Sequence, residues 1–439
     1  MNRKKKFSIV LICVLAASLT ASAQKKSYIS IDQATDIAAQ NNANVQISEW
    51  EHKISKADFH QTDAVFLPQI SIGYTAVTTN NALNAFGFLL QQRSVTSQDF
   101  DPAKLNHPGA TQNYGADISV KMPLINPDMI FARKGAKLQS EVYQYKKQYT
   151  KDMIEFEVKK AYTQLQFAYR AQSILRSTLS DVKQIHQSVK NFYDQGLVQK
   201  SDVLNAQVQV NTVESALAKA ESNVSNASDG LKLLMGAKGD ETVYEPDSLS
   251  QSSAIYNNSS FSSMRSDVMA MKKAMDASNM MVKSSALSFV PKINAFGTYS
   301  LSDSKAFGFN QNSYLLGINL SWNLFSGNRN ISKLRSSTFQ RNKMKEEYNL
   351  YVDKSQVEFN KTKRDLSDLQ VEINKQQTSV DQAAEALRIL SNRYAEGLTK
   401  TSDLLMAQAQ LSQQQLQLAQ AIMSYNITLY YLNLQSTMN

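Results

Sequence analysis

Residues 193–207 read YDQGLVQKSDVLNAQ, and residues 394–408 read YAEGLTKTSDLLMAQ. The two stretches lie 201 positions apart and are identical at eight of their 15 positions. A match of this length indicates that the chain is an internal duplication, in which each half repeats one set of secondary-structure elements. The fold can therefore be worked out by extending both copies outward from this segment.

Each copy contains the turn between two helices. Gly196 and Gly397 occupy the same position, where a glycine ends a helix in the left-handed conformation that other residues avoid. Ser201 and Ser402 follow them and are expected to cap the next helix. Each half is therefore predicted to contain an antiparallel helical hairpin with its tip at the glycine.

Long helices flank both tips. No proline occurs between 128 and 245 or after 291, and proline is the residue that breaks helix interiors. Apolar residues recur at helical spacing before the first tip and in a heptad after the second, which predicts helices that pack on one side. These residues are Leu175, Leu179, Val182, Ile185, Val189 and Phe192, then Leu404, Leu411, Leu418, Tyr425 and Leu432. A helix over 128–194 would be on the order of 100 Å long.

Four short segments alternate apolar and polar residues, as strands with two different faces do. Each is about as long as a strand that crosses a membrane. The segments are 68–79, 114–125, 291–302 and 314–325. Their aromatic residues tend toward segment ends, as in the interfacial girdle of a membrane barrel. These aromatics are Tyr74, Tyr114, Tyr299, Trp322 and Phe325.

The strands come as two hairpins separated by long helices. Four strands cannot close a barrel, and an open sheet edge is not tolerated in lipid. If the strands face lipid, the chain must oligomerise, and three copies would give a 12-stranded barrel. The predicted fold class is thus an α+β membrane protein, a trimeric transmembrane β-barrel with four strands per chain continued by a long α-helical coiled-coil tunnel.

The domain organisation follows the duplication. Residues 24–236 and 263–439 are predicted to be the two structural repeats, and 237–262 an irregular linker between them. Residues 80–113 join the first two strands and are expected to form a long polar loop, unlike the short connection of the second repeat.

Residues 1–23 have the pattern of a secretory signal peptide. A basic start is followed by an apolar run too short to span a bilayer and by small residues that fit cleavage before Gln24. Cys13, the single cysteine, lies in this segment, so disulfide scaffolds and thiolate metal sites are excluded from the mature chain. Four basic residues of the segment contribute to the formal net charge of +9. The remainder is closer to balance, which predicts no nucleic-acid partner.

With these features assembled, the chain resembles the outer-membrane efflux channels, the TolC-like family. The resemblance rests on Leu67-Pro68-Gln69-Ile70 at a strand entry, Leu324-Phe325-Ser326-Gly327 at a strand exit, and the two glycine tips. It implies a homotrimer in the bacterial outer membrane, in contact with outer-membrane lipid, with a helical tunnel in the periplasm. It further implies a passive duct of a tripartite efflux or type I secretion system, docked on a periplasmic membrane-fusion adaptor and an inner-membrane pump.

The resemblance also assigns roles to residues at the tips. Gly196 with Leu197, and Gly397 with Leu398, are expected to dock the adaptor. Asp403 matches an aspartate of an acidic ring that narrows the closed entrance, although a second acid of that ring is Met406 here.

Asp202 and Tyr394 match a hydrogen-bonded pair at the same constriction. From the residues alone, both aspartates can also be acids in the first turn of a helix, where the helix dipole favours them, and for Asp202 this capping interpretation is the preferred one. Both interpretations stay open at this point.

No enzyme active site is predicted. The four histidines, His52, His60, His107 and His186, lack metal-ligand spacing and a nucleophile pattern, and no cofactor or metal is expected. A secreted coiled-coil stalk protein is the alternative function. Such a stalk would need neither the alternating strands nor the paired tips.

Overall fold

The computed structural model describes residues 26–237, 242–252 and 261–436, so that the predicted signal peptide lies outside the described residues. The chain divides into two units. The sheet unit comprises residues 50–145 and 267–351. The hairpin unit comprises the chain up to Glu49 together with 146–266 and 352–439.

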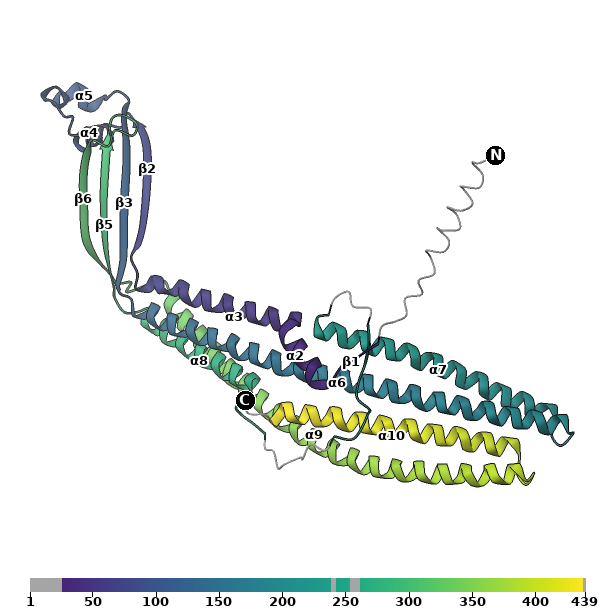
Figure 1. Ribbon diagram of the computed structural model, residues 1–439. Coiled ribbons are helices and arrows are strands. Elements are labelled where there is room, and N and C mark those ends of the chain that lie inside the picture. Colours follow the sequence, from purple (N-terminus) through teal and green to yellow (C-terminus); the bar gives the residue numbers. More distant parts are fainter. Residues whose placement is uncertain (1–25, 238–241, 253–260, 437–439) are drawn as a thin grey trace, which may run out of the picture. The chain divides into compact units, whose positions relative to one another are not determined.

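The sheet unit contains one four-stranded antiparallel sheet (Figure 1). Its strands are β2 (Gln69–Thr79), β3 (Thr111–Ile125), β5 (Lys292–Asp303) and β6 (Gln311–Ser321), in the order β2-β3-β5-β6. Each half of the chain supplies one hairpin, and the pairing of β3 with β5 joins them. The outer strands β2 and β6 each have one edge without a partner among the described residues.

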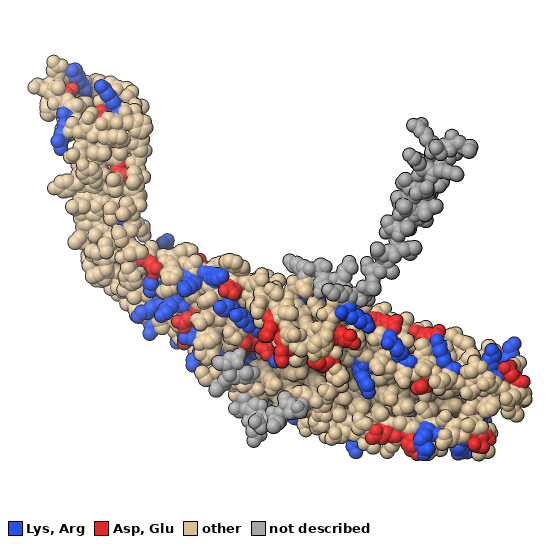
Figure 2. Space-filling view, in the orientation of Figure 1, with Lys and Arg blue, Asp and Glu red and all other residues tan. Residues whose placement is uncertain are grey.

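The strand register places the alternating apolar residues on one face. Ile72 lies opposite Ile118, which lies opposite Tyr299, which in turn lies opposite Tyr314. All four of these side chains are exposed. Figure 2 shows few charged side chains over the sheet, whereas they are frequent over the helices. An exposed apolar sheet face of this kind is the face that a membrane strand turns to lipid.

Two details of the predicted strands were wrong. Strand β6 ends at Ser321 rather than continuing to 325, because Ser321 pairs with Lys292, the first residue of β5, and Pro291 before it has no N–H to extend the ladder. Tyr74 and Tyr299 lie inside β2 and β5, away from their ends. The expected aromatic girdle therefore does not include these two tyrosines.

Residues 80–113 are not a simple polar loop. They contain α4 (Ala82–Gln91), η2 (Ser97–Phe100) and α5 (Pro102–Asn106). Helix α4 is largely apolar and is capped by Asn81, whose side chain accepts from the Asn84 N–H at 3.2 Å. The sequence prediction missed α4 because its ten residues are too few for the helical period to stand out.

The helices of the sheet unit continue from the strands. They are η1 (Thr62–Val65), α8 (Ser266–Leu287) and the nearer parts of α3 (Ala43–Gln61), α6 (Pro127–Asp194) and α9 (Arg329–Ala395). Arg133 of α6 forms an ion pair with Asp63 at 2.5 Å, and Lys273 of α8 forms one with Glu141 at 2.6 Å. These ion pairs tie the segments that enter and leave the sheet.

Two antiparallel helical hairpins form the hairpin unit (Figure 1). The first consists of α6 and α7 (Lys200–Met235), and the second of α9 and α10 (Thr401–Ser436). The predicted apolar stripe before the first tip and the heptad after the second are buried or half-buried. Helix α2 (Ile31–Asn41) begins with a capping box between Ser30 and Gln33 and packs on α7. The order of elements in the first half recurs in the second, which confirms the internal repeat.

The linker 237–262 is more ordered than predicted, within the part that the structure describes. Strand β4 (Val243–Glu245) pairs in parallel with β1 (Lys26–Tyr28). Behind this pair, the Tyr162 hydroxyl of α6 donates to the Asp247 carboxylate at 3.0 Å and accepts from the Asp247 N–H at 2.9 Å. The linker is thereby fixed to the side of the first hairpin. Over the described ranges, no helix combines the length and the apolar character needed to cross a membrane.

Candidate functional site: the hairpin tips and the seam between them

Both hairpin tips have the same backbone turn. Gly196 and Gly397 have φ of +74° and +71°, as predicted, and a Cβ added to either would meet nothing within 4 Å. In each turn the glycine N–H bonds to the carbonyl three residues earlier, and the following leucine N–H to the carbonyl five residues earlier. This is the Schellman motif, which satisfies the last carbonyls of a helix. Leu197 and Leu398 follow the glycines and are 68% and 66% exposed.

The helix after the first tip begins differently from the prediction. Gln199, not Ser201, is the N-cap of α7. The Asp202 carboxylate accepts from the Gln199 backbone N–H at 3.0 Å, which completes a capping box. Ser201 lies inside the first turn because the chain becomes helical one residue before it.

In the helix after the second tip, the matching acid, Asp403, has weaker hydrogen-bond partners than Asp202 has. Helix α10 begins at Thr401, so that Ser402 is also inside the helix and not its cap. Among the described residues, the exposed Asp403 carboxylate has two hydroxyl partners, Thr399 at 3.4 Å and Ser402 at 3.3 Å. Met406, one turn later, is 67% exposed. The two matching aspartates thus have different surroundings, since Asp202 is engaged with the backbone and Asp403 is not.

Tyr394 does not make the hydrogen bond that the family resemblance implied. Its hydroxyl lies 3.1 Å from that of Thr401, and both residues are buried. Burial raises the pKa of the Tyr394 hydroxyl, so that it stays neutral at physiological pH. Tyr394 and Asp202 nevertheless line one cavity of about 750 Å³ between the two tips, together with Leu197 and Gly397. The hydroxyl of Thr401 thus takes the place of the Asp202 carboxylate as the partner of Tyr394. Thr401 begins the helix that follows Tyr394 across the second tip.

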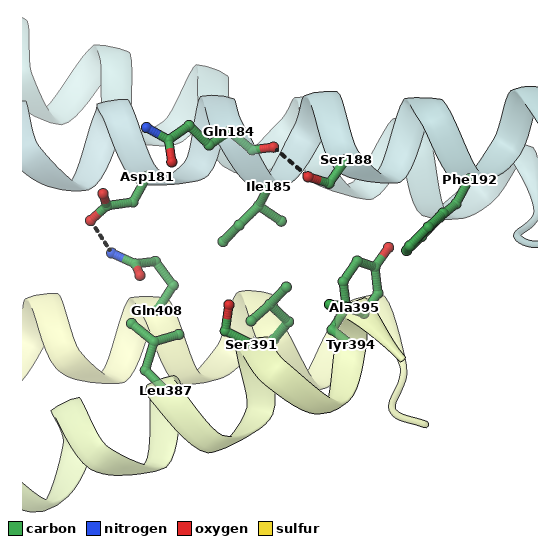
Figure 3. Close-up of a pocket in the computed structure, with 11 residues that line it drawn as sticks. Asp181, Gln184, Ile185, Ser188, Phe192, Leu387, Ser391, Tyr394, Ala395 and Gln408 are labelled. Carbon is green, nitrogen blue, oxygen red and sulfur yellow. Dashed lines mark hydrogen bonds between the residues drawn. The ribbon is translucent and has the colours of Figure 1, made fainter. Parts of the chain in front are cut away.

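A second set of contacts joins the two hairpins along a seam between α6 and α10. The Thr178 and Ser412 hydroxyls lie 3.0 Å apart, and the Gln408 side-chain N–H donates to the Asp181 carboxylate at 3.1 Å. Figure 3 shows Asp181 and Gln408 facing each other across the seam. Removal from water raises the pKa of the Asp181 carboxyl, although the bond from Gln408 works in the opposite direction.

The sequence prediction did not single out these seam residues. Asp181 directly precedes Val182 and stands one turn before Ile185, both members of the apolar stripe. A carboxylate beside an apolar seam was the signal that could have identified it.

The described residues hold no group of three or more histidine, cysteine or acidic side chains that could bind a metal ion. His60 lies 3.2 Å from Asp63 at the surface of the sheet unit. The tips and the seam offer charged and apolar contact surfaces.

Comparisons with known proteins agree with this geometry. The chain matches the family model of the outer membrane efflux proteins over residues 34–237 and 259–434. A comparison with curated protein sequences gives no significant match.

Among solved structures, CusC is similar with a TM-score of 0.81 and 16% identity, covering 93% of this chain and 92% of that one. VceC of Vibrio cholerae has a TM-score of 0.80 and 18% identity, covering 93% of this chain and 97% of that chain. The Campylobacter jejuni channel CmeC has a TM-score of 0.78 and 14% identity, covering 92% and 85%.

The family match spans both hairpins and all four strands, which a coiled-coil stalk would not require. The solved structures share the fold in which membrane strands are continued by a helical tunnel. The chain therefore belongs to the outer membrane efflux protein family, and is a passive export duct of the outer membrane whose tunnel extends into the periplasm.

Proposed function

We propose that three copies of the chain close one 12-stranded barrel. The observation that carries this proposal is the sheet order β2-β3-β5-β6, which leaves one edge of β2 and one of β6 without a partner strand in the part of the chain that the structure describes. Unpaired backbone groups in lipid cost several kcal/mol each, so both edges need partners. Because the four strands alternate in direction, β6 of one copy can pair antiparallel with β2 of the next.

Exposed apolar residues along α9 support the same assembly. Phe339, Leu350 and Val357 are more than half exposed in the single chain. They are separated by 11 and 7 residues, spacings that place them on one side of a helix. In the proposed trimer, a neighbouring copy would cover this apolar stripe, since the surfaces of soluble proteins rarely expose contiguous apolar residues.

The hairpin tips are proposed as the docking surface for a periplasmic membrane-fusion adaptor, which connects the duct to an inner-membrane pump. Leu197 and Leu398 present apolar side chains beside exposed backbone at the ends of both hairpins. Two equivalent tips per chain give six similar contacts in a trimer. In this proposal the pump supplies the energy, because the channels of this family are passive.

Asp403 is proposed as the constriction residue. Its carboxylate is exposed and, within the described part of the chain, is bonded by hydroxyls and not by the backbone, which suits a charge directed at the tunnel axis. Asp202 is proposed mainly as a helix-capping residue, with Tyr394 positioning the second tip through Thr401. We further propose that residues 1–23 are removed and that 24–236 and 263–439 act as the two repeats.

Paired cysteines at the sheet edges test the assembly. A purified channel without Cys13 provides a cysteine-free background. Pairing Ile72→Cys or Tyr74→Cys on β2 with Leu316→Cys or Ile318→Cys on β6 should give covalent trimers on oxidation.

The pair Ile72→Cys with Ile118→Cys is the control, because these residues are opposite each other within one chain. Covalent dimers without trimers, or a stable monomer by mass measurement in detergent, would contradict the proposal.

A further inference from the structure

A cavity of about 460 Å³ lies between the two hairpins, a short distance from the tips along the seam. Three helices line it (Figure 3). Helix α6 contributes Asp181, Gln184, Ile185, Ser188 and Phe192, whereas α9 and α10 contribute the rest, among them Leu387, Ser391, Tyr394, Leu404 and Gln408. All of these residues belong to the hairpin unit. Of the residues given a role at the tips, Tyr394 also lines this cavity.

A single carboxylate, that of Asp181, gives the cavity its charge. Asp181 is the only charged side chain that lines it, and no ion pair is found for Asp181 among the described residues. Its single hydrogen-bond partner in the described chain is the neutral amide of Gln408. Tyr394 is the other titratable lining residue, and its raised pKa keeps it neutral. A partly buried carboxylate with one neutral donor is poorly compensated, and a cation nearby would stabilise it.

The remainder of the lining is suited to the body of a small organic molecule. Ile185, Leu387 and Leu404 provide aliphatic walls. At the end near the tips, the rings of Phe192 and Tyr394 lie with centroids 5.4 Å apart and inclined at 51°. Apolar walls with a few polar groups are typical of ligand sites, and aromatic faces attract organic cations.

We propose that this cavity binds a monovalent organic cation with an apolar body, held between the hairpins with its charge against Asp181. The volume accommodates a small amine or quaternary ammonium compound. Gln184, Ser188 and Ser391 supply hydroxyl and amide groups at the rim. This site goes beyond the export duct and does not rest on the trimer, because one chain provides every lining residue.

Such a ligand would contact both hairpins at once. The seam beside it is held by Thr178 with Ser412 and by Asp181 with Gln408. A bound cation therefore favours whichever arrangement of α6 and α10 keeps the cavity formed, since a ligand shifts a protein toward the state it binds better. Binding at this site is thus coupled to the packing of the two hairpins against each other.

Benzyltrimethylammonium is the probe for the test, and its uncharged isostere neopentylbenzene is the matched control compound. Binding to the full-length channel in lipid nanodiscs is measured by saturation-transfer NMR. The variants are Asp181→Asn, which removes the charge at constant size, and Asp194→Asn, which makes the same change at an exposed position of α6 outside the cavity. Thermal melts show whether each variant is folded.

We expect the wild type and Asp194→Asn to bind the cation equally well. Asp181→Asn should bind it about tenfold more weakly, a change that corresponds to about 1.4 kcal/mol. The wild type should bind the uncharged isostere more weakly than the cation. Wild-type affinity should also fall as the pH is lowered through the raised pKa of Asp181, because protonation removes the charge. Equal binding by Asp181→Asn, equal binding of the isostere, or no detectable binding of the cation would each overturn the proposal.

Discussion

Exchanging Asp403 for asparagine should weaken the block of the channel by a trivalent cation. The carboxylate is exposed, and its partners in the described ranges are two hydroxyls at 3.3 and 3.4 Å, so most of its charge is available to an ion in the tunnel. In water, a trivalent ion about 8 Å from one carboxylate gains about 1.5 kcal/mol. The loss of even one such interaction therefore reduces the affinity of block about tenfold, and a trimer loses three.

The matched control is Asp202→Asn, at the same position of the first tip. Both substitutions remove an acid from the first turn of a helix, so both cost about 0.3–1 kcal/mol of stability through the helix dipole. Only Asp202 is committed to a backbone N–H, that of Gln199. Asp202→Asn should therefore melt at the lower temperature of the two, because it also weakens the capping box, while only Asp403→Asn changes the block.

The assay is conductance of single channels in planar bilayers, with the trivalent cation added from the periplasmic side at low salt. Higher ionic strength should reduce the difference between wild type and Asp403→Asn, because salt screens exposed charges. Met406 occupies the position of a possible second acid, so Met406→Asp should strengthen the block. Equal block in the wild type and in correctly assembled Asp403→Asn would refute the reasoning and leave Asp403 as a first-turn acid only.

Three further predictions concern stability, and thermal melts of the purified channel check each of them. Gly397→Ala should cost about 1–2 kcal/mol through its left-handed backbone alone, whereas Gly236→Ala should cost more, since at φ +70° its new Cβ would lie 2.5 Å from a carbonyl oxygen of α2. Equal losses would show that the contact at α2 relaxes freely.

Tyr394→Phe should cost about 1 kcal/mol by leaving the buried Thr401 hydroxyl unsatisfied. The double change with Thr401→Val should cost less than the sum, so that additive losses would contradict the pairing.

Asp63→Asn should remove a pH dependence. The hydrogen bond from the Arg133 guanidinium holds the pKa of the Asp63 carboxyl below its usual value. The contribution of Asp63 to the free energy of unfolding is therefore present above about pH 4 and is lost as the pH falls further. If the melting temperatures of the wild type and of Asp63→Asn changed with pH in the same way, this contribution of Asp63 would be excluded.

The repeated segment at the tips was the most informative part of the sequence for the fold. Its glycines mark positions where the backbone adopts a left-handed conformation that other residues avoid. Gly196 and Gly397 both have positive φ, and proline spacing and alternation located the long helices and the four strands, although not every strand end. Helix starts were less predictable. Gln199 caps α7 although serine is the better capping residue, because the register of the first turn is set by where Asp202 can reach the backbone.

The contacts between segments could not be predicted from spacing. Tyr394 pairs with Thr401, and Asp181 with Gln408, through distances that depend on how two helices are rotated about their axes. A heptad specifies which face is apolar, but not which polar side chains meet beside it. Helix α4 and the β1–β4 pair were missed for a related reason, since both are too short to show a period.

The pairing of β3 with β5 has a consequence for how the protein reaches its final state. Ile125 pairs with Ile293 and Tyr114 with Asp303, so that the chain must close a loop of more than 160 residues before these two strands can meet. Contacts this distant in sequence form slowly, and a two-stranded hairpin is at best marginally stable by itself. The helices, with their local contacts, should form first and the sheet last. Until then, the apolar strands of a newly exported chain remain exposed to aggregation, which makes the interval before membrane insertion the stage at which this protein most needs a holding chaperone.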